Sequence, residues 1–238
     1  MPAAYAHMVF GMEVTAILPI SAQESINRHP ELFGIGLQGP DILFYYHPSE
    51  TQAYVLYGHN IHKRPAADFF RYALVQLEKL AELEKEKAIA YLMGFLCHFI
   101  LDSNCHPIVR KHTFPGEASH RQIEREFDRF LMEKDKIRPV WFIPWTKTVP
   151  MAEKHADIIA LFYPEAGEQV IRRGIRNMRL YESVTTGYRM RSRLELTHIS
   201  EQLEERMKAS LEAAPEIFSQ FPDCPAELFW ETVNRNFG

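Results

Sequence analysis

Hydrophobic residues recur along most of the chain with the period of an α-helix, and the alternating pattern of a β-strand is almost absent. Pro19 ends the first predicted helix, and Pro65 opens a later one. Ser21 with Glu24 predicts a capping box for a short helix, and Ser119 predicts another N-cap. The predicted helical segments are residues 5–18, a short helix from 21, 65–82, 86–102, 119–134, 150–177 and 184–214, and residues 221–236 form a terminal segment. The pattern therefore predicts an all-α fold, most simply one domain over residues 1–238.

Glycine and proline concentrate in two stretches that do not follow the helical pattern. Gly34, Gly36, Gly39 and Pro40 predict a turn-rich segment that leads into Asp41. The stretch 136–150 contains three prolines, which exclude a regular helix there.

The segment 86–102 is apolar on nearly every side, which predicts a buried helix. His98 and Asp102 nevertheless interrupt it four residues apart, so their side chains share one face of the helix. An imidazole and a carboxylate in such a place cost several kcal/mol, in order of magnitude, unless something satisfies them. Zinc accepts both histidine nitrogen and carboxylate oxygen as ligands. The pattern therefore indicates a metal site.

A second histidine–carboxylate pair with the same spacing, His120 and Glu124, follows in the next predicted helix. Collecting the candidate ligands along the chain gives His7, Asp41, His59 or His62, His98, Asp102, His106, His120 and Glu124. A catalytic zinc ion takes about three protein ligands and keeps one position open for water. These side chains are too many for one ion and suit two or three.

Composition and charge narrow the class of protein. The net charge of −4 gives no basic surplus of the kind that binds nucleic acid or anionic membranes. The three cysteines include no CxxC spacing and favour reduced thiols. We find neither a secretory signal nor an apolar run of about 18 residues or more, so we expect a cytoplasmic protein without a transmembrane segment.

With these motifs collected, the sequence resembles the bacterial zinc-dependent phospholipase C family. More distantly it resembles the single-strand-specific zinc nucleases that share its all-helical trinuclear fold. The resemblance rests on the order and spacing of the ligand motifs within residues 1–128. In the simplest interpretation of the helical pattern, the C-terminal helices of residues 150–238 pack around these motifs. Asp102 and His106 stand closer together than in the secreted phospholipases, which predicts a tighter turn between them.

The resemblance implies a role for each candidate ligand. His7 and the N-terminal amine, of Met1 or Pro2, would bind one ion. A second ion would be held by Asp41, a downstream histidine and the His98–Asp102 helix, with Asp102 bridging two ions; a third would be held by His106, His120 and Glu124. For the downstream histidine we choose His62 over His59, because it introduces the helix at Pro65. By spacing alone, Asp41 is an ordinary turn residue.

The function implied is hydrolysis of a phosphodiester, such as a phospholipid headgroup or a small molecule, at two or three Zn²⁺ ions. Asp41 would be a ligand and the general base. Phe44, Tyr45 and Tyr46 directly follow it and are expected to line the mouth of the site. One alternative is a zinc nuclease of the same fold, although no stable nucleic-acid complex is expected. The other is a metal-binding protein without catalytic activity.

Overall fold

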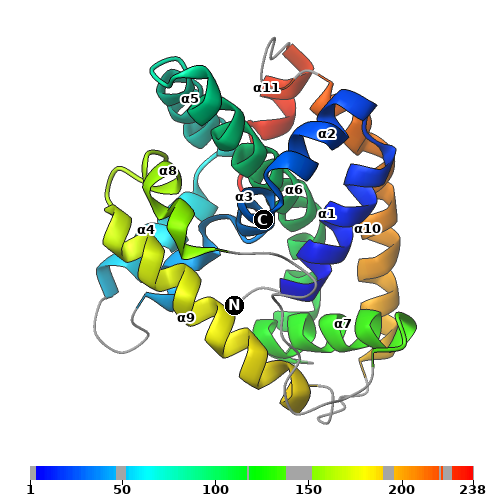
Figure 1. Cartoon of the computed structure of the whole chain (residues 1–238). Helices are drawn as coiled ribbons and strands as arrows, with labels where there is room; N and C mark the ends of the chain where they lie inside the picture. Colours follow the sequence, from blue (N-terminus) through cyan, green and yellow to red (C-terminus); the bar gives the residue numbers. More distant parts are fainter. Residues whose placement is uncertain are drawn as a thin grey trace.

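The computed structural model describes residues 4–46, 52–116, 118–137, 152–189, 196–219, 221 and 227–237, and these residues form helices and connections without a strand (Figure 1). The predicted all-α fold is confirmed. The helices are α1 Ala4–Ile17, α2 Ile20–Arg28, α3 Pro30–Gly36, η1 Gly39–Tyr45, α4 Gln52–Lys63, α5 Ala66–Leu77, α6 Glu82–Thr113, α7 His120–Lys134, η3 Glu153–His155, α8 Ala156–Ala160, α9 Glu168–Arg189, α10 Thr197–Phe218 and α11 Glu227–Val233.

Helix α6 runs through the middle of the molecule and is covered on several sides by other helices (Figure 1). By length and composition it is the one helix in the described part of the chain that is apolar enough to cross a membrane. However, 89% of its most apolar window is buried inside the fold, so the other helices already cover this surface. This burial agrees with the all-round apolar pattern of the sequence.

Helix α6 is longer than predicted, because it continues beyond Asp102 and through Pro107 to Thr113. The predicted tight turn between Asp102 and His106 is therefore wrong. A proline inside a helix costs about 3 kcal/mol. The second half of α6 remains helical because Cys105, Val109 and His112 are buried there, where α6 packs against α10. As a result, His98, Asp102 and His106 follow one another at consecutive turns of one helix.

The glycine-rich segment before Asp41 is helical rather than turn-like, which corrects the prediction for Gly34 and Gly36. Helix α3 packs along α6 so closely that a Cβ atom on Gly36 would lie 2.1 Å from the carbonyl oxygen of Tyr91. A Cβ on Gly94 of α6 would lie 2.2 Å from the carbonyl oxygen of Phe33. These glycines serve the close approach of two backbones, and that approach brings Asp41 in the following η1 to the face of α6 that carries His98.

The two predicted helix caps have different outcomes. Ser119 caps α7 by accepting a hydrogen bond from the backbone N–H of Gln122, whose side chain completes the capping box, as predicted for this serine. Ser21 is not a cap, because α2 begins at Ile20 and Pro19 occupies its N-cap position without a side-chain hydrogen bond.

Both ends of the described chain form hydrogen bonds with helices that carry candidate ligands. Asp128 of α7 is buried and accepts hydrogen bonds from the backbone N–H groups of Tyr5 and Ala6, at the first turn of α1. The side chain of Phe237 is fully buried, and its backbone N–H donates to the carbonyl of His62 on α4. Helix α10 packs against α1, α6 and α7. The packing therefore fixes the relative positions of α1, α4, α6 and α7.

Candidate metal centre

Five histidines and three carboxylates from five elements converge where α1, η1, α4, α6 and α7 meet. Their ligand atoms fall into three groups, within each of which all atoms lie within 4.8 Å of one another. The groups are His7, His98 and Asp102; Asp41, His62 and His98; and His106, His120 and Glu124. With His62 as the downstream histidine, the sequence predicted eight candidate ligands. The structure brings all eight together in these three groups.

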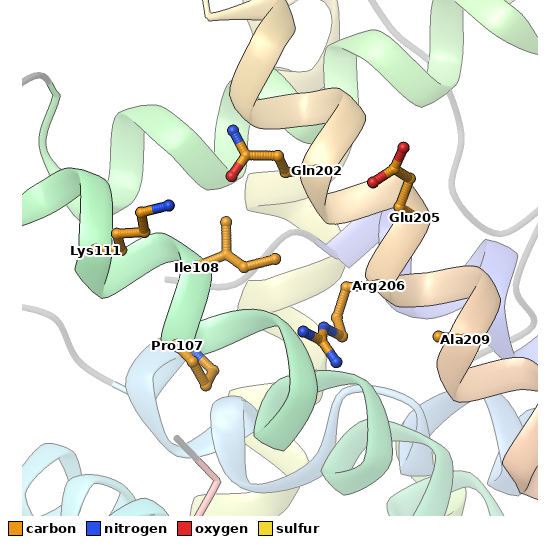
Figure 2. Close-up of a pocket in the computed structure, with 7 residues that line it drawn as sticks. All are labelled: Pro107, Ile108, Lys111, Gln202, Glu205, Arg206 and Ala209. Carbon is orange, nitrogen blue, oxygen red and sulfur yellow. The ribbon is translucent and has the colours of Figure 1, made fainter.

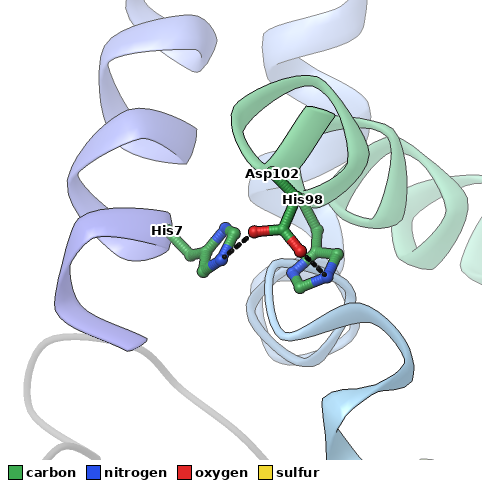
Figure 3. A group of neighbouring side chains, drawn as sticks. All are labelled: His7, His98 and Asp102. Carbon is green, nitrogen blue, oxygen red and sulfur yellow. Dashed lines mark ion pairs between the residues drawn. The ribbon is translucent and has the colours of Figure 1, made fainter. Parts of the chain in front are cut away.

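Asp102 lies between histidines from two helices (Figure 3). Its Oδ1 atom is 3.2 Å from Nε2 of His7 on α1, and its Oδ2 atom is 3.4 Å from Nε2 of His98 on α6. The same Oδ2 atom is 3.8 Å from Nε2 of His62 and 3.7 Å from Nδ1 of His106. The two oxygens of this buried carboxylate therefore face different sets of imidazoles, which is the arrangement of a carboxylate shared between two sites.

Asp41 is 2% exposed and faces two histidines across the interface between η1, α4 and α6. Its Oδ1 atom lies 3.1 Å from Nε2 of His62, and its Oδ2 atom lies 4.0 Å from Nε2 of His98. Gly39 permits this approach, because its backbone has a φ of +51° and a Cβ there would meet the ring of His98 at 2.4 Å.

The third group is closer to the surface. Oε1 of Glu124 lies 2.7 Å from Nε2 of His120 and 3.3 Å from Nε2 of His106. Glu124 is buried, whereas the side chain of His120 is 42% exposed. His120 and Glu124 come from consecutive turns of α7, as their spacing predicted.

Backbone carbonyls orient three of the imidazoles. His98 donates from Nδ1 to the Leu37 carbonyl at 3.2 Å, His62 to the Gly58 carbonyl at 2.7 Å, and His106 to the Phe237 carbonyl at 2.8 Å. In each case Nε2 is left to face the cluster. A histidine that ligates a metal commonly donates its other ring N–H in this way. The sequence analysis missed these three partners, because a backbone carbonyl carries no residue signature.

The donor atoms fit zinc in their chemistry and in their separations. Ligands of a tetrahedral zinc ion, at about 2.0–2.2 Å from the metal, lie about 3.3 Å from one another. The imidazole–carboxylate distances in the first two groups, 3.1–4.0 Å, are close to this value. In addition, Nε2 of His98 and Oδ2 of Asp41 are buried without a hydrogen-bond partner among the described residues. A bound cation satisfies both atoms, since unpaired buried polar groups are otherwise costly.

The pKa values of the candidate ligands depend on burial and on the positive and negative charges of neighbouring ligands. Burial lowers the pKa of His98 to about 4, which keeps its imidazole neutral. Burial also opposes the charge on His106, but Asp102 and Glu124 outweigh it and raise the pKa of His106 to about 10. Burial opposes the charge on Glu124, yet hydrogen bonds from His106 and His120 lower its pKa to about 2. The carboxyl group of Glu124 is therefore ionised, as a metal ligand must be.

A cavity of about 370 Å³ opens beside the cluster. Besides the candidate ligands Asp41, His62, Asp102, His106, His120 and Glu124, the described residues that line it are Phe44, His59, Lys63 and Arg121. His59 is exposed, and its ring lies 4.8 Å from the ring of Phe44. It belongs to none of the three groups, so in the described part of the chain His62 is the histidine of α4 that faces Asp41.

Of the three aromatic residues expected at the mouth, Phe44 lines the cavity and the other two do not line it within the described structure. Tyr45 is buried and donates a hydrogen bond from its hydroxyl to Glu182 of α9 at 3.0 Å. Tyr46 packs beneath the guanidinium of Arg173, also on α9. The expectation fails for these two tyrosines because α9 covers η1, which adjacency in the sequence does not reveal.

A larger cavity of about 460 Å³ lies between α6 and α10 (Figure 2). Lys111, Glu205 and Arg206 line it together with apolar side chains, and all three are exposed. It contains none of the grouped donors, so we place the functional site at the smaller cavity. The possible ligands Met1 and Pro2 lie outside the described residues.

Comparison with known protein families gives a match. The family model described as "Zinc dependent phospholipase C" matches residues 6–182, which include all eight grouped donors. No curated protein and no solved structure is significantly similar to the chain.

Proposed function

The chain belongs to the zinc-dependent phospholipase C family, and from this membership we propose that it is a hydrolase that cleaves phosphodiesters with metal-activated water. One observation supports the proposal above the others. Eight imidazole and carboxylate side chains converge in groups of the size that catalytic zinc sites use, and six of them line one cavity. We propose two or three zinc ions per chain.

In this proposal each group of side chains binds metal at a different place in the site. His7, His62 and His98 present ring nitrogens, while Asp102 offers one oxygen to each side and joins the first two groups. His106, His120 and Glu124 form the third group at the mouth. When bound, zinc would hold phosphate oxygens, lower the pKa of a water molecule and stabilise the attacking and leaving oxygens.

We assign Asp41 two tasks, metal binding and proton transfer. Asp41 lines the cavity; its Oδ1 atom faces His62, and its buried Oδ2 atom has no hydrogen-bond partner among the described residues. A carboxylate that contacts both the metal and its bound water can accept the proton of the attacking water. Burial of the surrounding groups excludes bulk water from this floor.

The test is hydrolysis of a panel of phosphodiesters by purified protein with measured zinc content. We expect headgroup release from short-chain phosphatidylcholine or phosphatidylinositol, loss of activity on chelation and recovery with Zn²⁺. Asp41→Asn should abolish release while most zinc is retained. The matched control is Asp157→Asn, an exposed carboxyl outside the cavity, which should leave zinc and activity unchanged.

Two results would replace the proposal. Zinc-dependent release of mononucleotides from a single-stranded oligonucleotide, without headgroup release, would identify a nuclease. Full zinc occupancy with no hydrolysis of any ester in the panel would identify a metal-binding protein that lacks catalysis.

A further inference from the structure

The walls of the cavity carry charges that the metal ligands do not explain. Four of the described residues that line it are not among the grouped donors, namely Phe44, His59, Lys63 and Arg121. Lys63 and Arg121 are exposed cations, and neither forms an ion pair within the described structure. Partial desolvation lowers the pKa of His59, and the neighbouring His62 and Lys63 lower it further, so this imidazole is neutral near pH 7. None of the four residues carries a negative charge.

Each cation lies directly beside a candidate ligand. Lys63 follows His62 at the end of α4, and Arg121 follows His120 in the first turn of α7. The two ligands belong to different groups of the cluster, one with Asp41 and the other with Glu124. A phosphate held between these groups would therefore have a cation beside it on each of two elements. Bound metal ions would make the floor positive as well.

This lining does not suit a quaternary ammonium headgroup such as choline. Such groups are recognised by faces of several aromatic rings, which attract the cation. Among the described lining residues the cavity offers one aromatic ring, Phe44, and that ring already packs against His59 and His62. The carboxylates in the lining are all candidate metal ligands, so they are committed to the metal when it is bound.

We propose that the substrate is a phosphodiester whose headgroup carries a second negative group, either a phosphate or a carboxylate. Lys63 and Arg121 bind this second group. The proposal rests on the proposed function. Each favourable pairing at about 4 Å near a protein surface changes binding by about tenfold or more. Guanidinium in addition donates two parallel hydrogen bonds to phosphate or carboxylate, and ammonium acts as a point charge.

The first arm of the test measures hydrolysis of two soluble short-chain lipids, dihexanoyl phosphatidylcholine and dihexanoyl phosphatidylinositol 4-phosphate. For the zinc-loaded protein we expect kcat/KM to be at least about tenfold higher for the anionic lipid. The charge-reversed double variant Lys63→Glu with Arg121→Glu should lower that value about 100-fold and should raise the value for the choline lipid. Lys79→Glu, an exposed lysine outside the cavity, is the matched control and should leave both values unchanged.

A second pair of substrates, glycerophosphocholine and glycerophosphoinositol 4-phosphate, identifies the source of the headgroup. Preference for the anionic member without acyl chains assigns a soluble ester, and preference only among the lipids assigns a lipid. Both results support the proposal. An equal or higher value for the choline compounds, unchanged in the double variant, would overturn it.

The second arm separates this proposal from the proposed function. Calorimetry measures binding of inositol 1,4-bisphosphate and of phosphocholine to zinc-loaded wild-type and double-variant protein of equal zinc content. Tighter binding of the bisphosphate that is lost in the double variant supports the charge assignment, even where no ester is cleaved and the proposed function fails. Equal binding of the two compounds, or binding unaffected by charge reversal, contradicts it.

Discussion

The two parts of the metal centre differ in how they are built. The inner part, formed by His7, Asp41, His62, His98 and Asp102, draws on four elements, and the side chain of His98 has no exposed surface. The outer part, formed by His106, His120 and Glu124, draws on two helices, and the side chain of His120 is 42% exposed. The comparison suggests that the inner part holds its metal firmly through tertiary packing, while the outer part exchanges metal and meets the substrate.

The largest effect should come from Asp102, because its oxygens face histidines of both inner groups and also His106. We expect Asp102→Asn to remove zinc from the inner part and to lower metal affinity or activity at least about 100-fold. Loss of a residue that only supports a metal ligand costs up to about 100-fold. Zinc content after dialysis is the measurement. Asp157→Asn is the control, and an Asp102→Asn protein with full zinc content would show that the inner part does not depend on this carboxylate.

The next effect concerns the scaffold of the inner part. Gly36→Ala places a methyl group against the backbone of Tyr91, so the free energy of unfolding of the zinc-free protein should fall by about 3 kcal/mol. The matched control is Gly167→Ala, where a Cβ meets nothing within 4 Å, and its change should stay within about 0.5 kcal/mol. Urea unfolding gives both values, and similar losses for the two variants would argue against close packing of α3 on α6.

A smaller and more local effect is expected from Glu124→Gln, because Glu124 contacts His106 and His120, the two histidines of the outer part. This variant should lose one zinc ion per chain and keep the inner metal. Stopped-flow release to a chelator should show the corresponding fast phase in the wild-type protein and its absence in the variant. Release of all zinc in a single phase by both proteins would remove the distinction between inner and outer parts.

The smallest signal is the proton balance of zinc binding. In the zinc-free protein His106 has a pKa raised to about 10, so at pH 7 it carries a proton that must leave before its nitrogen can bind metal. Zinc binding at pH 7 should therefore release about one proton from this site, and release should decrease as the pH approaches 10. Calorimetry in two buffers with different ionisation enthalpies measures it. Binding that releases no proton at pH 7 would exclude His106 as a ligand.

The side chains of the site could be predicted because polar residues at helical spacing stand out in an apolar segment. His98 with Asp102 and His120 with Glu124 are the examples. What holds them in place could not be predicted, because the orienting carbonyls of Leu37, Gly58 and Phe237 come from the backbone. The same applies to Phe237, since the sequence does not single out this residue as the one that packs beside His62 and His98.

The errors in the fold have related causes. Glycines before Asp41 indicated a turn, although Gly36 serves a close contact between two helices that depends on Gly94, far along the chain. The predicted helix ended at Asp102, although burial of Val109 beyond Pro107 keeps α6 helical to Thr113. In both cases a local preference gives way to packing between distant segments.

The most direct test of the account is the number and location of zinc ions in the folded protein. Elemental analysis of dialysed protein, together with anomalous diffraction at the zinc edge, measures both. We predict two or three ions per chain, with one between Asp41, His62 and His98 and one between His106, His120 and Glu124. A folded protein that binds no zinc, or binds it only away from these side chains, would contradict the account.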